Sequence, residues 1–332
     1  GRRPTRAHRT GRGGQRRPMG DIRTGTASWT DPSLIGSGWY PDDATTPQRR
    51  LGYYASRFPV VEVDSAYYAL PRAPVAQLWA ERTPDGFTFN VKAFSLLTHH
   101  PTRVSALPVE LRGAAAGAVN RRGVLYLHAA APDLVEQVWD RFRGALEPLR
   151  RAGRLGAVLF QFPQWFPYGE DTLRYLLECR DRCAPLRVCV EFRNRTWLDS
   201  GHRERTLAFL RGHGLPYVCV DMPQGHASSV PPVAEAVSDL AVVRFHGRSE
   251  HWAGGDKRRR FGYRYSDEEL AEWVPRVGRL AERAASVHVL FNNCLRDYAV
   301  RNAERFTGLL RAAELPVLPP PRPTAESSWS QK

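Results

Sequence analysis

The chain has 332 residues, of which 42% are hydrophobic and 25% are charged, a composition typical of a globular protein with a sizeable core. Its longest apolar runs have the length of strands, so the sequence predicts no membrane span. The net charge is +14, and residues 1–18 supply half of it through seven arginines without an acid. Of the 48 basic residues only three are lysines, so this arginine bias makes basicity a weak argument for a nucleic-acid partner.

The N-terminus is basic but lacks the apolar segment of a secretory signal, and the five cysteines include no CxxC motif. Both features predict a cytoplasmic protein with reduced cysteines. Cys179 and Cys183 are one helical turn apart, a spacing that also suits a metal or cluster site. We expect residues 1–20 to be a disordered basic tail, and the Pro- and Ser-rich residues 316–332 to be a second one. The sequence leaves the cofactor and the oligomeric state open.

Strand–loop–helix units follow one another from residue 21 to residue 315. The expected strands are 22–28, 60–64, 87–92, 156–161, 188–193, 217–221, 241–246 and 287–292. The expected helices are 47–57, 74–82, 132–151, 170–182, 201–213, 267–283 and 297–313. Because such units place their strands in parallel, they predict a single-domain (β/α)8 TIM-type barrel, with a doubly wound open sheet as the alternative.

The third unit is longer than the others because about residues 102–131 are inserted between its strand and its helix. Loops of this length often form lids or binding elements. Residues 120–131 can instead form an extra hairpin, and the sequence does not decide between the two.

Side chains alternate across a strand, so the face opposite the apolar one is expected to point into the barrel. Near the carboxyl ends of the strands, where such barrels carry their active sites, every strand supplies a polar residue. The set is Thr26, Glu62, Asp64, Lys92, Gln161, Glu191, Arg193, Asp221, Arg244, His246 and Asn292. We interpret it as a functional cluster, with a buried ion-pair network as the alternative.

Four chemistries fit this set. Glu62 and Glu191 suit an acid and a base acting on a glycoside, if their separation allows it. Carboxylates and His246 suit a divalent metal, although there is no HxxxH or HExxH motif and nearby cations compete, so no metal ligand is assigned. Lys92 suits a Schiff-base or proton-transfer role. Lys92, Arg193 and Arg244 suit a phosphate or carboxylate, which we prefer because it requires least of the unknown geometry.

The loops that leave the strands are rich in aromatic residues and cations, which favours a ligand that is ringed and anionic. The candidate ligand-binding residues there are Trp29, Tyr68, His99, Trp197, Arg248 and Trp252, beside the basic run 257–260. His246 is the best acid–base candidate because it shares a strand face with Arg244. Asn292 and Asn293 are expected to orient a ligand or to cap the next helix.

An ordered series of motifs runs through the chain. It comprises GTASW (25–29), WYP (39–41), VEVDS (61–65), VKA (91–93), GAVLFQFP (156–163), VEFR (190–193), VRFHGR (243–248) and FNN (291–293). Over about residues 22–312 this series resembles the YecE-like family, also known as domain of unknown function seventy-two. Ala27, Gln164, the basic tail and residues 102–131 depart from the family's pattern.

The resemblance implies a TIM-type barrel in a cytoplasmic bacterial or archaeal protein, without a settled activity. A likeness to endonuclease-IV-type barrels, with DNA binding or phosphodiester cleavage, has been suggested for the family. This sequence does not supply the many His and carboxylate ligands of that enzyme's metal site.

The sequence therefore predicts a barrel that binds an anionic ringed ligand at its C-terminal mouth: a phosphorylated sugar, a nucleotide or a nucleic acid. As a hydrolase or lyase it would use Glu191 and Asp221 as acid–base or electrostatic residues, supported by Glu62 and Asp64. The alternatives are a non-catalytic nucleic-acid-binding protein and a metal-dependent phosphodiesterase.

Overall fold

Eight parallel strands form the wall of a nearly closed barrel in the computed structural model, which describes residues 17–323. They are β1 (Asp21–Thr26), β2 (Val60–Val63), β3 (Thr88–Lys92), β6 (Leu155–Gln161), β7 (Val188–Glu191), β8 (Val218–Asp221), β9 (Leu240–Phe245) and β10 (Ser286–Phe291). Their order is β7-β6-β3-β2-β1-β10-β9-β8, and a bridge between Val190 and Tyr217 joins the two edges. The predicted TIM-type barrel is confirmed, and the open sheet is excluded.

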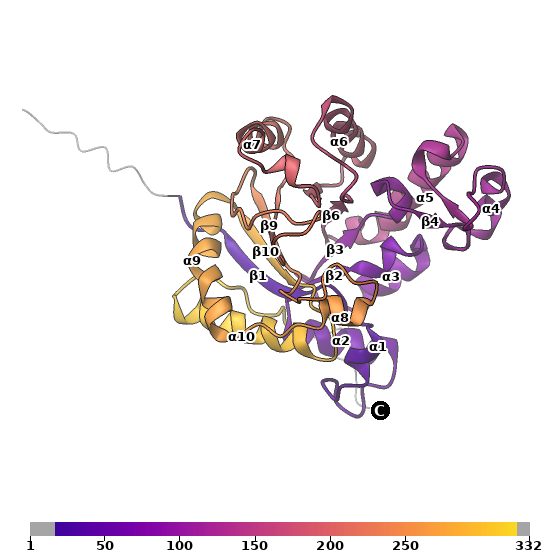
Figure 1. Cartoon of the computed structure of the whole chain (residues 1–332). Coiled ribbons are helices and arrows are strands. Elements are labelled where there is room, and N and C mark those ends of the chain that lie inside the picture. Colours follow the sequence, from indigo (N-terminus) through magenta and orange to yellow (C-terminus); the bar gives the residue numbers. More distant parts are fainter. Residues whose placement is uncertain (1–16, 324–332) are drawn as a thin grey trace, which may run out of the picture.

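Helices surround this wall (Figure 1). They are α1 (Pro32–Ile35), α2 (Pro47–Arg57), α3 (Ala73–Glu81), α5 (Pro132–Arg151), α6 (Glu170–Cys183), α7 (Arg203–Gly212), α8 (Lys257–Phe261), α9 (Asp267–Arg283) and α10 (Tyr298–Ala312), with α4 (Val109–Ala115) in the insertion. Within residues 17–323, no helix joins β8 to β9, because three prolines interrupt the connecting segment 222–239. No described helix has the length and apolar character needed to cross a membrane.

Each strand turns alternate side chains to the helices and to the barrel interior. Phe245 and Phe291 face outward, where Phe245 packs on Trp273 of α9 at 5.2 Å between ring centroids and Phe291 packs on Phe306 of α10 at 5.9 Å. Arg244, between two outward-facing residues of β9, consequently points inward. This alternation lets distant strands contribute polar side chains to one interior site.

The insertion after β3 forms a small two-stranded hairpin at the periphery, beside α5 (Figure 1). Its strands β4 (Thr102–Arg103) and β5 (Val124–Leu125) pair antiparallel, with α4 between them in the chain. The hairpin alternative was therefore the better one, although its first strand lies earlier than residues 120–131.

Two segments that the sequence places in tails pack against the barrel. Gly20 N donates to Ala281 O at 2.7 Å, and Ile22 exchanges backbone hydrogen bonds with Pro316 and Leu318. The reason lies in β1, which pairs with β2 only at Gly25 and Thr26 and so leaves its first residues free for another segment. The expectation of disorder is corrected for these residues, while residues 1–16 and 324–332 lie outside the described range.

Candidate functional site

The side chain of Arg244 lies at the centre of the barrel interior, near the carboxyl ends of the strands. Its Nε and Nη2 donate to the two carboxylate oxygens of Glu62 at 2.9 and 2.6 Å, and its Nη1 donates to Glu191 Oε2 at 2.6 Å. The three side chains come from β9, β2 and β7, and each is 0% exposed. Charge-assisted hydrogen bonds in a planar fork stabilise charges that burial would otherwise destabilise.

His246 and Arg193 extend this group towards the mouth of the barrel. Asn292 Nδ2 donates to His246 Nδ1 at 3.0 Å, so Nε2 carries the hydrogen that faces Glu191 Oε1 at 2.9 Å. Arg193 Nε donates to the same oxygen at 2.8 Å. Arg193 is 11% exposed and is the member that faces solvent. We call Glu62, Glu191, Arg193, Arg244 and His246 the interior cluster.

The two carboxyl groups of the interior cluster have pKa values shifted in opposite directions. Burial raises the pKa of Glu62, and the single contacting guanidinium of Arg244 only partly offsets it. Burial also pushes the pKa of Glu191 upward, but Arg244, His246 and Arg193 together outweigh it and hold that pKa well below its usual range. Burial, followed by the charge of Arg193, lowers the pKa of His246 to about 3. At neutral pH Glu191 is ionised, His246 is neutral, and Glu62 is the carboxyl that accepts a proton more readily.

A second ion pair lies where β2 and β3 end. Lys92 Nζ donates to Asp64 Oδ1 at 3.2 Å and lies 4.4 Å from the centre of the Tyr67 ring. The His100 ring packs edge-on against Tyr67 at 5.2 Å. Burial, and then the charges of Lys92 and Arg193, lower the pKa of His100 to about 3. Lys92 and Arg193 therefore act on one region of the mouth.

The loop that follows β9 adds cations and aromatic rings to this region. Trp252 lies near two guanidinium groups, with Arg193 Cζ at 5.3 Å and Arg260 Cζ at 5.9 Å from its ring centre. Lys257 Nζ lies 4.3 Å from the Tyr68 ring centre and donates to its hydroxyl at 2.8 Å. The structure thus brings together the predicted residues Lys92, Arg193 and Trp252, with Tyr68 exposed beside them.

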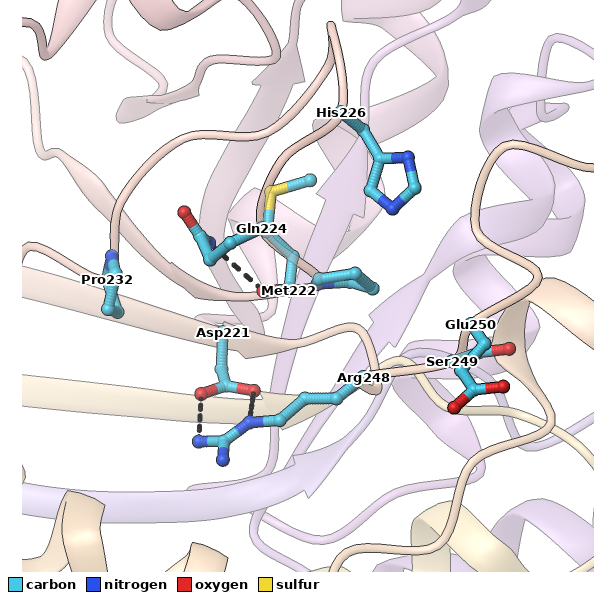
Figure 2. Close-up of a pocket in the computed structure, with 9 residues that line it drawn as sticks. Asp221, Met222, Gln224, His226, Pro232, Arg248, Ser249 and Glu250 are labelled. Atoms are coloured by element: carbon cyan, nitrogen blue, oxygen red, sulfur yellow. Dashed lines mark hydrogen bonds and ion pairs between the residues drawn. The ribbon is translucent and has the colours of Figure 1, made fainter.

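Asp221 lies apart from the interior cluster. It pairs with Phe245 in the sheet register and so faces outward, where Tyr265 Oη and Trp273 Nε1 donate to it at 2.7 and 2.8 Å. Arg248 Nε and Nη2 bind its two oxygens at 3.0 and 2.8 Å. Figure 2 shows this pair among the residues that line a cavity of about 490 Å³ beside the 222–232 loop. The expectation that Asp221 points into the barrel beside Glu191 is corrected.

Residues 23–327 match a family model that is described as "Protein of unknown function DUF72". The chain belongs to the DUF72 family. The UPF0759 protein YunF of Bacillus subtilis is 33% identical over 296 residues, which cover 87% of this chain and 94% of YunF. The predicted YecE-like membership is thereby confirmed.

Solved DUF72 structures share this barrel. A DUF72 protein of Thermotoga maritima matches with a TM-score of 0.70 and 28% identity, covering 88% of this chain and 99% of its own. A DUF72 protein of Enterococcus faecalis matches with a TM-score of 0.70 and 26% identity, covering 87% of this chain and 95% of its own. The family description assigns no activity.

Several predicted ligand-binding residues of this DUF72 chain have structural partners instead. Trp29 is 5% exposed and packs edge-on against Trp79 at 5.7 Å. Trp197 is fully buried, stacks on Phe192 at 4.2 Å and donates through Nε1 to a backbone carbonyl. Asn293 Nδ2 donates to a neighbouring loop carbonyl at 2.8 Å. These three residues hold the loops together, and Arg248 is occupied by Asp221 as described above.

Two residues that the sequence predicted to face inward remain. Thr26 is wrong in direction, because its Oγ1 lies 2.9 Å from the hydroxyl of Tyr54 on α2, outside the barrel. Gln161 pairs with Glu191 in the sheet register and therefore faces inward, and it is half-buried. Its Nε2 has a long hydrogen bond of 3.4 Å to the carbonyl of the next residue, which leaves it available near the mouth.

Tyr67 and His100 lie on loops that leave the strands, as expected from the sequence, but they were not predicted to bind the ligand. Both follow strands of the barrel, but a single polar or aromatic residue in a loop gives no signal of its direction. Among residues 17–323, no three His, Cys, Asp or Glu side chains gather as metal ligands, and Cys179 and Cys183 are buried. The described residues therefore give no support to the metal-dependent phosphodiesterase.

Proposed function

We propose that this DUF72 barrel binds a small ligand with a ring and an anionic group at its C-terminal mouth. Lys92 and Arg193 contact the anion in this proposal. The observation that carries it is their shared position: both are partly exposed, at 10% and 11%, and each lies against an aromatic ring. Tyr67 and Trp252 supply those rings, whose faces suit a sugar or a base.

The interior cluster supports this role by fixing Arg193. Glu191 Oε1 accepts from Arg193 Nε at 2.8 Å and holds that side of the guanidinium. Nη2 lies 3.1 Å from His246 Nε2, which carries a hydrogen and so does not accept from it. Among the hydrogen bonds of residues 17–323, none uses Arg193 Nη1, so that edge remains for a carboxylate or phosphate oxygen. A guanidinium held in advance loses little conformational entropy when the ligand binds.

A hydrolase or lyase acting on the same ligand is the second candidate. The observation that favours it is the opposite shift of the pKa values of Glu62 and Glu191, the arrangement that assigns acid and base roles to paired carboxyls. Both carboxyls are 0% exposed, so neither contacts a ligand at the mouth unless a side chain that covers it, such as Arg193 over Glu191, moves.

Isothermal titration calorimetry of the full chain against glucose 6-phosphate and glucuronate tests the binding proposal. Wild type should bind at least one of them. Lys92→Met and Arg193→Met should each weaken that binding about tenfold or more, because each removes a charge-assisted hydrogen bond.

The matched control is Arg279→Met, which removes an exposed arginine from α9. It should leave the affinity unchanged. If neither compound binds, or if both mouth variants bind as tightly as wild type, the proposal is wrong.

A further inference from the structure

The hairpin outside the barrel mouth carries a basic hollow. Arg103, Arg121 and Arg122 line a cavity of about 560 Å³ together with Tyr126, and all three arginines are exposed. Within residues 17–323, none of these arginines forms an ion pair, and no acid lines the cavity. Three uncompensated guanidinium groups around one hollow create a positive potential that suits an anion.

The backbone fixes these arginines relative to one another. Arg103 pairs with Val124 across the two strands, so it lies beside the turn that carries the other two arginines. In that turn Asn120 Oδ1 accepts from the backbone nitrogens of Arg122 and Val124 at 2.9 and 3.2 Å. Gly123 closes the turn with a φ of +70°, which a residue with a side chain rarely adopts. The backbone positions that carry the three arginines are therefore set before a ligand arrives.

A second cavity adjoins this hollow and shares Tyr126 with it. It has a volume of about 260 Å³ and is lined by aromatic and imidazole rings, including Trp165 and His128. Tyr126 stacks on His128 with 5.6 Å between ring centroids and 27° between planes. Trp165 is 52% exposed, and its Nε1 is held by the carbonyl of His99 at 2.9 Å. Exposed, oriented ring faces of this kind bind planar ligands by stacking.

His99 provides a polar group in the second cavity. Its backbone has a φ of 62°, in the left-handed region that few residues other than glycine adopt. Its Nε2 is buried and, among the described residues, has no hydrogen-bond partner. Burial lowers the pKa of His99 to about 4, so the imidazole is neutral at physiological pH. A buried ring nitrogen without a partner is unfavourable, so a ligand group that reached it from the cavity would relieve that cost.

We infer that the two cavities together bind a nucleoside monophosphate, at a site distinct from the barrel mouth. The base stacks between Trp165 and Tyr126, and His99 Nε2 hydrogen-bonds to its edge. The phosphate is bound by Arg103 and by the turn at 121–122. A heterocyclic base with a phosphate matches the three features found here: ring faces, an unpaired ring nitrogen and clustered arginines.

The hairpin site lies next to the mouth but uses different cations. His100 packs against Tyr67 at the mouth and against Trp165 of the second cavity, at 5.2 and 5.9 Å between ring centroids. His99 packs instead against Tyr175 at 4.5 Å and Phe166 at 5.3 Å. The hairpin site uses neither Lys92 nor Arg193, so it can be removed without disturbing the mouth.

The test measures the binding of AMP to the full chain by calorimetry and by the quenching of tryptophan fluorescence. The double variant Arg121→Ala/Arg122→Ala should weaken binding about tenfold or more, because it removes two charged donors to the phosphate. The control Arg211→Ala/Arg279→Ala removes two exposed arginines from α7 and α9 and should bind like wild type. Equal affinity of the two double variants would overturn the inference.

Further comparisons separate the parts of the site. His99→Asn should weaken AMP binding severalfold while retaining the fold, since asparagine tolerates the left-handed conformation. Adenosine and inorganic phosphate should each bind about tenfold or more weakly than AMP, because each fills one cavity only. Phosphate binding as tightly as AMP would show that no ring is recognised. An AMP affinity lost in Lys92→Met but kept in the Arg121/Arg122 variant would place AMP at the mouth and overturn the hairpin site.

Discussion

Two arginine–carboxylate assemblies lie at the carboxyl ends of neighbouring strands, and they differ in what surrounds them. Arg244 joins Glu62 and Glu191 inside the barrel, where all three side chains are sealed from solvent. Arg248 joins Asp221 outside the wall, where the arginine is 28% exposed (Figure 2). Both arginines bind a carboxylate through two nitrogens, so the pairing itself does not distinguish them.

The difference lies in what remains when the arginine is removed. Asp221 keeps two neutral donors, Tyr265 Oη and Trp273 Nε1, which tie β8 to α9 and its preceding loop. Among the hydrogen bonds of the described residues, Glu62 has no side-chain donor other than Arg244. Asp221 therefore stays hydrogen-bonded without Arg248, whereas the buried carboxylate of Glu62 is paired only as long as Arg244 is present. We expect function to be concentrated in the interior cluster.

The largest expected effect is the loss of stability in Arg244→Met. It leaves Glu62 buried without a cation, and breaking such a pair costs about 3–5 kcal/mol in the free energy of unfolding. Arg248→Met should cost about 1–2 kcal/mol, because the outer arginine is partly solvated and Asp221 keeps its neutral donors. Urea denaturation of both variants at pH 7 measures the difference. Equal losses would show that the two assemblies are energetically alike.

The next effect concerns pH. The pKa of His246 is about 3 in the folded protein and 6.5 in the unfolded chain, so below pH 6.5 the unfolded chain binds a proton that the folded protein does not. Stability should therefore fall as the pH drops from about 6.5 towards 3, and Glu191, whose pKa is also lowered, adds to this fall in acid. His246→Asn should reduce the slope by about 1.4 kcal/mol per pH unit within this window.

Urea denaturation of wild type and His246→Asn at several pH values between 8 and 5 measures this slope. Above the window, the two proteins should differ by a constant amount. Parallel curves throughout the range would mean that His246 takes up its proton as easily in the folded protein as in the unfolded chain.

The smallest expected effect on stability is that of a double variant, and it tests whether the charges of the interior cluster serve stability or ligand binding. Glu62→Met with Arg244→Met replaces a buried ion pair by apolar side chains and leaves Glu191 paired with Arg193. The double variant should recover most of the stability lost in Arg244→Met, to within about 1 kcal/mol of wild type. If its ligand affinity is lost while its stability returns, the charges serve binding. If stability and ligand affinity both return, the Glu62–Arg244 ion pair is needed for neither stability nor binding.

The barrel and most of the interior cluster could be predicted from the sequence, because β2, β3, β7 and β9 alternate apolar and polar residues near their ends. The direction of Asp221 could not, since VCVD in β8 is apolar on both faces and its alternation contains no cue. The predicted direction of Thr26 was wrong for the opposite reason, because β1 has polar residues on both faces. The hairpin strands have two residues each, too few for a period to show.

The bridge between Val190 and Tyr217 has a mechanical consequence. It is the shortest main-chain pairing in the wall, because β7 and β8 meet there in one isolated bridge, which includes the bond from Val190 N to Pro216 O at 3.0 Å. Arg244 on β9 reaches across β8 to Glu191 on β7, and it also holds Glu62 on β2. The interior cluster thus joins β7 to β9 and β2 through side chains, and so reinforces the cylinder where its main-chain pairing is weakest.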